Sequence, residues 1–439
     1  MNSVPDTRDS ALKTQDSVLS TLAEWLGYLE QLHPKTIDLG LERVAEVKNR
    51  LKLNPGFPLI TVSGTNGKGS TCAMLEAILL AAGYRVGLYT SPHLLRYNER
   101  VRINGTEAPD DALCSAFAAV EQARGEVSLT YFEFGTLAAV WLFSRAGLDA
   151  AILEVGLGGR LDAVNAFDTD CALLTSVDYD HMDYLGESRE QIGFEKAGIF
   201  RAGRPAICGE YDVPYSVTEH AEKIGAVMHF IGRDFGYDGV EQNQWKFSSR
   251  DGLRLVLPHP SLRGAYQLGN ASVCLAALEQ LKARLPVAPD DIRRGLLEVT
   301  LPGRFQVLPG RPQRIMDVAH NPHAAKALAA NLRNMPPTGK TIAVFAMLCD
   351  KDIAGVVRAM KEQVDLWFVA GISQPRGASA EGMLEVLEEA GLASRTQAFQ
   401  TVAEAYRHAC NKAADDDKII IFGSFYTVAE AMTLAAAKG

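Results

Sequence analysis

The chain has 439 residues, of which 47% are hydrophobic and 22% charged, and its 44 basic and 53 acidic residues give a net charge of −9. At roughly 150 residues per domain this length predicts two or three domains, and the composition excludes disorder, collagen and coiled coil as the main state. The acidic balance disfavours general binding to nucleic acid or acidic membranes, so an anionic ligand must meet a local cluster of positive groups.

The cysteines and the N-terminal segment indicate the compartment. Seven cysteines are scattered without a C-x-x-C pair, so we expect neither a disulfide framework nor a zinc site. The first residues are polar and lack the apolar core of a secretory signal, and no run of about 18 apolar residues predicts a transmembrane helix. We therefore expect a cytoplasmic protein.

Apolar, β-branched runs alternate with helical patterns in the first 300 residues, which is typical of parallel sheets flanked by helices. Strands are expected at 57–63, 85–90, 149–155, 171–177 and 205–208. Helices are expected from Ser70 to Ala82, ended by Gly83, and near 132–146, 187–200 and 270–284. Residues 209–265 contain turn residues and short alternating stretches, and we expect an antiparallel addition there.

Leu301-Pro302-Gly303-Arg304 interrupts both periodicities, because proline and glycine break helices and strands alike. Beyond this segment, strands are expected at 313–318, 341–347, 365–370 and 418–422, with helices between them. We therefore expect an α/β protein with an N-terminal domain over 1–300, a hinge over 301–307 and a smaller, Rossmann-like α/β domain over 308–439.

A glycine-rich loop, Gly64-Thr65-Asn66-Gly67-Lys68-Gly69-Ser70, lies between an expected strand and an expected helix. Glycines let several N–H groups point at one anion, the helix N-terminus adds a partial positive charge and Lys68 adds a full one. The strict pattern G-x-x-x-x-G-K-[ST] is not matched, because Val62 and Gly69 occupy two of its defining positions. A tight turn with a surface lysine is the alternative. The context favours a phosphate site, which makes the first domain a P-loop-type ATPase domain.

Further candidates follow expected strands on the same side of the sheet. They are Ser91-Pro92-His93-Leu94, Glu154, His181 and Lys196. In a parallel sheet the carboxyl ends of the strands share one edge, where ligands bind. Glu154 and His181 suit Mg²⁺ held together with phosphate oxygens. Taken singly, each candidate is also compatible with an ordinary role in a salt bridge, a cap or a solvated helix face.

In the second domain, Asp317 and His320 follow an expected strand and stand three positions apart, so they can project to one side of the loop. Pro322 fits the first position of a helix. Capping of that helix by Asp317 is the alternative to a ligand-binding role.

Seven segments occur together in a fixed order: GTNGKGS, TSPHLLRYNERV, LEVGLGGRLDA, D-H-x-x-x-L-G, EKAGIF, PGRFQ and DVAHNPH. From about Trp25 to Tyr426 the chain thereby resembles the folylpolyglutamate synthase family, and most closely its bacterial bifunctional members, which also have dihydrofolate synthase activity. The family belongs to the Mur ligase superfamily of ATP-dependent amide-forming enzymes.

The resemblance implies a role for each matching residue. The ATP phosphates would be bound by Thr65, Asn66, Gly67, Lys68, Gly69 and Ser70, and the nucleotide would be contacted by Asn270, Arg304 and Asp317. Mg²⁺ would be held by Ser91, Glu154 and His181, and a second Mg²⁺ by Lys196 if this lysine is carbamylated. The catalytic residues would be Lys68, Lys196 and His320, with His320 facing phosphate or incoming glutamate. Binding of a monovalent cation is left open.

Bifunctional members also have a dihydropteroate pocket. Its matching residues would be Asp38, Leu39, Gly40, Leu41, Thr130, Tyr131, Phe132, Glu133, Leu161, Asp162 and Ala163. Tyr131 and Phe132 offer flat faces for a pterin ring, although both also suit the core at the start of a helix. Monofunctional synthases lack this pocket, so these segments decide which activities we expect.

The resemblance implies that L-glutamate is added to 7,8-dihydropteroate and to the γ-carboxyl of reduced folates, through an acyl phosphate made from ATP. The partners would be these small molecules, with neither nucleic acid nor membrane, and we expect a monomer although the sequence does not distinguish it from a dimer. The alternatives are a monofunctional folylpolyglutamate synthase, another Mur-type amino-acid ligase, an inactive ATP-binding regulator, and a P-loop kinase or GTPase.

Overall fold

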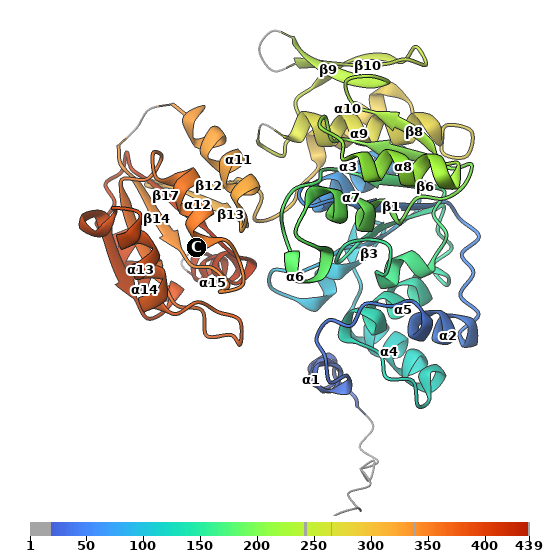
Figure 1. Cartoon of the computed structure of the whole chain (residues 1–439), viewed down its shortest axis with the longest axis horizontal. Coiled ribbons are helices and arrows are strands. Elements are labelled where there is room, and N and C mark those ends of the chain that lie inside the picture. The colour runs from blue at the N-terminus through green and yellow to red at the C-terminus, as the bar shows by residue number, and fades with distance from the viewer. Residues whose placement is uncertain (1–18, 241–243, 265, 337–338, 438–439) are drawn as a thin grey trace, which may run out of the picture.

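The computed structural model describes residues 19–240, 244–264, 266–336 and 339–437. In these ranges it has three β-sheets with helices packed around them. Figure 1 shows two of the sheets in one part of the molecule, coloured blue to yellow, and the third in a second part, coloured orange to red. The chain passes between the two parts near residue 300, where the sequence predicts a hinge. The domain boundaries themselves stay a prediction.

The central sheet has eight strands in the order β4-β3-β2-β5-β1-β6-β7-β8. The strands are β1 (Leu59–Ser63), β2 (Val86–Tyr89), β3 (Val101–Ile103), β4 (Thr106–Glu107), β5 (Ala150–Glu154), β6 (Cys171–Leu174), β7 (Pro205–Cys208) and β8 (Val227–Phe230). Neighbours from β2 to β8 are parallel, and β3 and β4 extend one edge in antiparallel fashion. The five strands predicted in this region are confirmed, with bounds that differ by at most three residues.

Helices cover both faces of the central sheet, so its inner strands are buried on both sides. In β1, Leu59 packs into the core of one face, while Ile60 and Val62 pack into the core of the other. This two-sided burial explains why the strands read as continuous apolar runs. On one face lie α3 (Lys68–Ala81), α9 (Gln267–Gln280) and α10 (Pro289–Glu298). On the other face lie α1 (Leu22–Leu32), α2 (Glu42–Arg50), α4 (Asp110–Arg124), α5 (Tyr131–Phe143), α7 (Arg189–Ala197) and α8 (Tyr215–Ile224), together with the short η2 (Ala163–Ala166).

The helix predictions are confirmed with small differences in their bounds. Helix α3 begins at Lys68, two residues before the predicted start, because the glycine loop leads directly into the first turn. The predicted helices near 132–146, 187–200 and 270–284 are α5, α7 and α9. The remaining short elements are η1 (Tyr97–Arg100) and α6 (Met182–Leu185).

The expected antiparallel addition over 209–265 is correct only for its second half. Strands β9 (Phe235–Val240), β10 (Gln244–Ser249) and β11 (Arg254–Pro258) form an antiparallel sheet. This sheet packs on α9 and buries Trp245 and Phe247. The first half instead continues the central sheet, because α8 carries the chain across to β8, which pairs parallel with β7. Strand β8 lies at the sheet edge and is only partly buried, so its sequence lacks the apolar run of an inner strand.

The third sheet has the order β12-β13-β17-β14-β15-β16. Its strands are β12 (Gln306–Leu308), β13 (Gln313–Asp317), β14 (Thr341–Phe345), β15 (Leu366–Ala370), β16 (Thr396–Phe399) and β17 (Lys418–Phe422). One face is covered by α11 (Pro322–Arg333), α12 (Ile353–Met360) and α13 (Ala380–Glu389), with η3 (Ala393–Arg395) before β16, and the other by α14 (Val402–Lys412) and α15 (Phe425–Ala436). The predicted Rossmann-like α/β arrangement is confirmed, and the four predicted strands are β13, β14, β15 and β17.

Two further findings bear on the sequence analysis. None of the described helices is both long enough and apolar enough to cross a membrane. All seven cysteines are free thiols.

Candidate functional site

A cavity of about 780 Å³ lies at the carboxyl edge of the central sheet and is lined by residues of both parts of the molecule. It brings together every site residue predicted from the sequence except Leu41 and Tyr131. The glycine loop, the ends of β5 and β6, the start of α5 and the start of α11 all contribute to its wall. The expectation that ligands bind where the carboxyl ends of parallel strands meet therefore identified segments that are far apart in the sequence but surround one cavity.

The glycine loop has a conformation that only glycine allows at two positions. Gly64 and Gly67 have φ of +150° and +89°. A Cβ at Gly64 would lie 1.9 Å from Thr175 Oγ1, and one at Gly67 would lie 2.7 Å from Asn270 Oδ1. Gly67 is the N-cap of α3 and offers no side-chain cap, so the first N–H groups of this helix remain available to an anion.

Lys68 begins α3 and folds back over the loop. Its ammonium donates to the carbonyl oxygens of Gly64 at 2.8 Å and Thr65 at 3.3 Å. These are weak partners for a full charge, so an incoming phosphate can replace them. The charge of Lys68 opposes the rise in the pKa of Glu154 and adds to the fall in the pKa of Lys196, which puts Lys68 close to both.

Glu154 ends β5 and is a buried carboxylate with a single protein donor. Its side chain is 4% exposed and accepts one hydrogen bond, from the Ser91 N–H at 3.2 Å. Burial raises the pKa of Glu154, although Lys68 and the Ser91 N–H pull it down. A cation bound to this carboxylate would stabilise the ionised form.

Lys196, near the end of α7, is 5% exposed, and none of the described residues forms a hydrogen bond or ion pair with its side-chain ammonium. Burial lowers the pKa of Lys196 to about 7, and the charge of Lys68 acts in the same direction. A large fraction of the amine is therefore neutral near pH 7, which is the form that reacts as a nucleophile.

The C-terminal part contributes Arg304, Asp317 and His320. Asp317 accepts hydrogen bonds from the N–H groups of Phe305 and Ala319, both at 2.8 Å. Burial raises the pKa of Asp317, and the guanidinium of Arg304 opposes this rise. The alternative that Asp317 caps α11 is wrong, because Asn321 is the N-cap. Asp317 and Arg304 both line the cavity.

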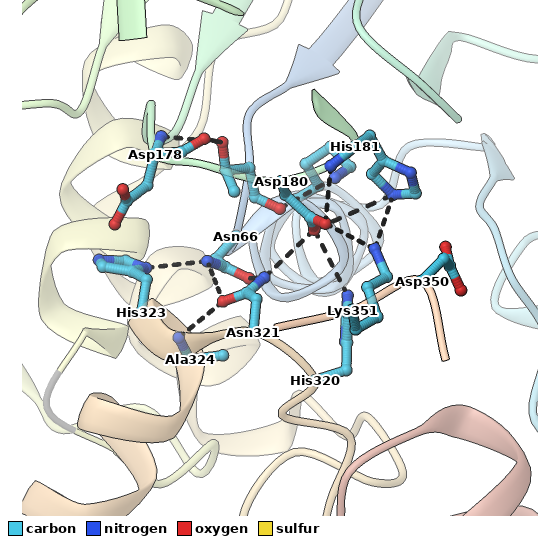
Figure 2. A network of polar contacts seen from close by, with 12 residues as sticks. Asn66, Asp178, Asp180, His181, His320, Asn321, His323, Ala324, Asp350 and Lys351 are labelled. Atoms are coloured by element: carbon cyan, nitrogen blue, oxygen red, sulfur yellow. Dashed lines mark hydrogen bonds and ion pairs between the residues drawn. The ribbon is translucent and has the colours of Figure 1, made fainter. Parts of the chain in front are cut away.

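Residues on the loop before α6 contact the C-terminal part directly, as Figure 2 shows. Asp180 Oδ1 lies 2.5 Å from Lys351 Nζ, and Asp180 Oδ2 lies 3.7 Å from His320 Nε2. Burial alone would raise the pKa of Asp180, but His320, His181 and Lys351 hold it well below its usual range. Burial lowers the pKa of His181 to about 4, so its ring is neutral and can act as a ligand near pH 7.

The sequence analysis did not single out Lys351 or Asp180. Asp180 was present within a quoted motif, directly before His181. Lys351 lies in the loop after β14, so a search for polar residues that follow parallel strands could have found it. No motif of the first part marks it, because its partner lies 171 residues earlier in the chain.

The predicted dihydropteroate segments form one wall of the cavity. Phe132 lies against Gly156, where a Cβ would come within 2.6 Å of the Phe132 ring. Asp162 accepts N–H groups of Leu157 at 2.9 Å and Val164 at 3.0 Å, and burial raises its pKa to about 7. A carboxyl beside an aromatic face suits a flat heterocycle with N–H donors on its edge.

An ion-pair chain holds this wall together. Thr130 and Glu133 form a reciprocal capping box at the start of α5. Glu133 also pairs with Arg43 at 3.0 Å, and Arg43 pairs with Asp38 at 2.7 Å.

Two predicted pocket residues lie outside the cavity wall. Tyr131 packs edge-on against Tyr97, with ring centroids 5.8 Å apart, and under the Arg100 guanidinium at 5.5 Å. Leu41 is the N-cap of α2 and packs against the core. Neither side chain lines the cavity, whereas their neighbours Phe132 and Gly40 do.

Among the described residues, no three His, Cys, Asp or Glu side chains are grouped so as to hold a metal ion by themselves. The donors near the phosphate loop are the Glu154 carboxylate, the His181 ring and the Ser91 side chain. This set fits Mg²⁺, which is commonly bound through one or two carboxylates together with substrate phosphates and water.

Comparisons with known proteins agree on one family. The family model for the Mur ligase middle domain matches residues 62–278, and that for the Mur ligase glutamate ligase domain matches residues 303–425. The dihydrofolate synthase/folylpolyglutamate synthase of Escherichia coli strain K12 is 48% identical over 428 residues, which are 97% of this chain and 98% of the relative. The Haemophilus influenzae protein of the same name is 43% identical, over 94% of this chain and 97% of its own.

Solved structures agree as well. E. coli FolC in complex with DHPP and ADP is 48% identical, with a TM-score of 0.91 over 97% of this chain and 100% of that chain. A bifunctional folylpolyglutamate synthase/dihydrofolate synthase with Mn, AMPPNP and L-glutamate bound is 48% identical, with a TM-score of 0.88 over 95% and 99% of the two chains. The resemblance that seven motifs indicated is therefore confirmed, and the chain belongs to the dihydrofolate synthase/folylpolyglutamate synthase family of Mur ligases.

Proposed function

We propose that the protein is an ATP-dependent ligase that adds L-glutamate to 7,8-dihydropteroate, giving dihydrofolate, and adds further glutamates to the γ-carboxyl of reduced folates. One observation carries the proposal: a single cavity joins a phosphate loop to a separate wall containing Phe132 and the buried Asp162 carboxyl. The relatives crystallised with DHPP and ADP, and with AMPPNP and L-glutamate, support both ends of this assignment.

The reaction needs an activated carboxyl, because a carboxylate does not condense with an amine in water. The acceptor carboxylate attacks the γ-phosphorus of ATP, forming an acyl phosphate and releasing ADP. The amino group of L-glutamate then attacks the acyl carbon, the amide bond forms and inorganic phosphate leaves. Lys68, Arg304 and the first N–H groups of α3 would offset the repulsion between the two anions in the first step.

Ser91, Glu154 and His181 would hold a divalent cation, which we propose to be Mg²⁺ because these are oxygen and nitrogen donors beside a phosphate site. The cation would neutralise charge on the phosphates. Lys196, once carbamylated, would present a carboxylate to a second ion. The Mn present in a relative supports a divalent metal, and a monovalent cation stays an open prediction.

Closure of the two parts would shield the acyl phosphate from water. We place the hinge at residues 301–307, between domains over 1–300 and 308–439. Gly303 and Phe305 have positive φ of 71° and 43° there, which gives the chain a sharp local turn. A monomer located in the cytoplasm stays a prediction.

The test is ADP release from the purified protein with ATP, Mg²⁺ and L-glutamate, with either dihydropteroate or tetrahydrofolate as acceptor and with product masses measured in parallel. Lys68→Ala is the control, because it removes the ammonium group of the glycine loop. The rate of ADP release should fall at least about 100-fold with both acceptors. Turnover with tetrahydrofolate alone would leave a monofunctional synthase. Turnover with neither acceptor would point to another Mur-type amino-acid ligase.

A further inference from the structure

Asn321 connects three segments of the chain with one side chain. It is the N-cap of α11, and its Oδ1 accepts a hydrogen bond from the Ala324 N–H at 2.9 Å. Its Nδ2 donates to Asn66 Oδ1 at 3.1 Å, in the phosphate loop, and to Asp180 Oδ2 at 3.2 Å, in the loop before α6. Figure 2 shows Asn321 between these two loops.

The orientation of the Asn321 amide follows from its partners. The Ala324 N–H requires an oxygen, so the nitrogen of the amide faces Asn66 and Asp180. The Asp180 carboxylate is an acceptor only, which agrees with this orientation. Asn321 is 2% exposed, so an unpaired donor or acceptor at this position would carry a desolvation penalty.

Asn66 completes the contact from the other side. Its Nδ2 lies 3.3 Å from Asn321 Oδ1 and 2.8 Å from His323 Nδ1, so the two asparagines form a reciprocal amide pair. The Asn66 backbone N–H donates a hydrogen bond to Ser176 Oγ at 3.0 Å. In this structure the Asn66 side chain therefore binds the C-terminal part, and its role in phosphate binding stays a prediction.

We propose that Asn321 is a positioning residue that sets the phosphate loop and the Asp180–His181 loop in register with the C-terminal part. An amide is suited to this task because it donates and accepts at once, so a single side chain caps α11 and holds both loops. The inference rests on the proposed function for its catalytic consequence. Its structural consequence, the contact between the two parts of the molecule, does not depend on that function.

Two variants keep the cap and remove the contact. Asn321→Asp has the same shape and caps as well as asparagine, but it cannot donate and it places a negative charge beside Asp180. Asn321→Ser also caps, adds no charge and is too short to reach both loops. The matched control is Thr401→Ala, which removes the N-cap of α14 at a residue outside the cavity wall.

Small-angle X-ray scattering of the purified protein measures the separation of the two parts directly. The wild-type curve should match the curve calculated from this structure, and both Asn321 variants should have a larger radius of gyration while Thr401→Ala does not. A wild-type curve that requires separated parts, or unchanged curves for both variants, would overturn the proposal. This holds whether or not the protein is a ligase.

Kinetics give the second readout. With either acceptor, kcat at saturating ATP should fall on the order of 100-fold in both Asn321 variants, since a misplaced catalytic group costs that much. A purely structural role would lower activity only with the folded fraction, as Thr401→Ala is expected to do. Adding Asn66→Ala to Asn321→Ser should reduce kcat by much less than it does in the wild type, because the two side chains act through one contact. Wild-type kcat in both variants would refute the positioning role.

Discussion

Three ionisable residues in the cavity, Glu154, Asp162 and Lys196, are buried, and burial disfavours the charged form of each. Burial raises the pKa of Glu154 and raises that of Asp162 to about 7, and it lowers that of Lys196 to about 7. Lys68 lies close enough to act on all three. A bound ligand of opposite charge would therefore stabilise the ionised form of each group.

We predict that Lys196 forms a carbamate with CO₂, in which the neutral amine attacks the carbon and releases a proton. Because burial lowers the pKa of Lys196 to about 7, the reactive fraction grows as the pH rises through about 7 and is lost below it. Carbon NMR with labelled bicarbonate should show a carbamate signal above pH 7 that weakens below it. Lys196→Arg should lack the signal, since guanidinium stays protonated. An absent signal in the wild type above pH 7 would remove Lys196 from the metal site.

Elements differ in how far the sequence could predict them. The strands with two buried faces, β1, β2, β5 and β6, were predicted because burial on both sides produces an unbroken apolar run. Strands β8, β12 and β16 were missed because they lie at sheet edges and are only partly buried, so they lack an unbroken apolar run.

The same distinction applies to the site. The glycine loop and the strand-end residues form local patterns, so the sequence could identify them. Asn321 and Lys351 contact segments that are at least 141 residues away in the sequence. A local sequence pattern cannot predict which of these segments will meet. The orientation of a side chain is also not encoded locally, which is why Tyr131 was expected beside Phe132 in the pocket although it packs against Tyr97.

Helix α3 and strand β3 share a buried ion pair that should make stability depend on pH. Glu76 lies 3.2 Å from Arg102, and burial raises the pKa of Glu76 to about 6 from 4.5 despite this partner. The folded state therefore holds the proton more tightly than the unfolded state, so stability is lost as the pH rises from about 4.5 through about 6. Relative to Glu76→Gln, the free energy of unfolding of the wild type should fall by about 2 kcal/mol across this range. Parallel pH profiles in chemical denaturation would contradict the assignment.

We expect the start of α5 to distinguish the two activities. Phe132→Ala removes the flat face beside Gly156, and we predict that the KM for dihydropteroate rises about tenfold or more. Tyr131→Phe is the matched control, because it keeps the ring that packs against Tyr97 and should leave both KM values unchanged. The comparison requires initial rates with both acceptors. An equal effect of the two substitutions would mean that Phe132 has only a packing role.

At the scale of the whole molecule, the cavity lies between two parts of the chain, and a buried ion pair joins these parts. Lys351 and Asp180 are only 7% and 10% exposed, although they belong to different parts of the molecule. Removing one partner of such a pair leaves the other charge buried and uncompensated.

We predict that Lys351→Met lowers kcat/KM for L-glutamate on the order of 100-fold, which corresponds to about 3 kcal/mol. The exposed Lys340 supplies the control, since Lys340→Met removes the same charge without touching Asp180. Steady-state rates at fixed ATP and acceptor distinguish the two variants. Equal rates for both would show that the Lys351–Asp180 pair has no part in turnover.

The central sheet fixes the distance between the glycine loop and the wall at Gly156. This fixed distance limits how successive glutamate additions can occur on one bound acceptor. Val62 and Glu154 are register partners on the neighbouring strands β1 and β5, so the wall that begins at Gly156 keeps one distance from the glycine loop. Every turnover lengthens the acceptor by one glutamyl unit, while this distance does not change. A product that kept its pterin against Phe132 would carry its new carboxyl past the phosphate. We therefore predict distributive synthesis, in which each product leaves the cavity before the next unit is added and intermediate chain lengths appear free in solution.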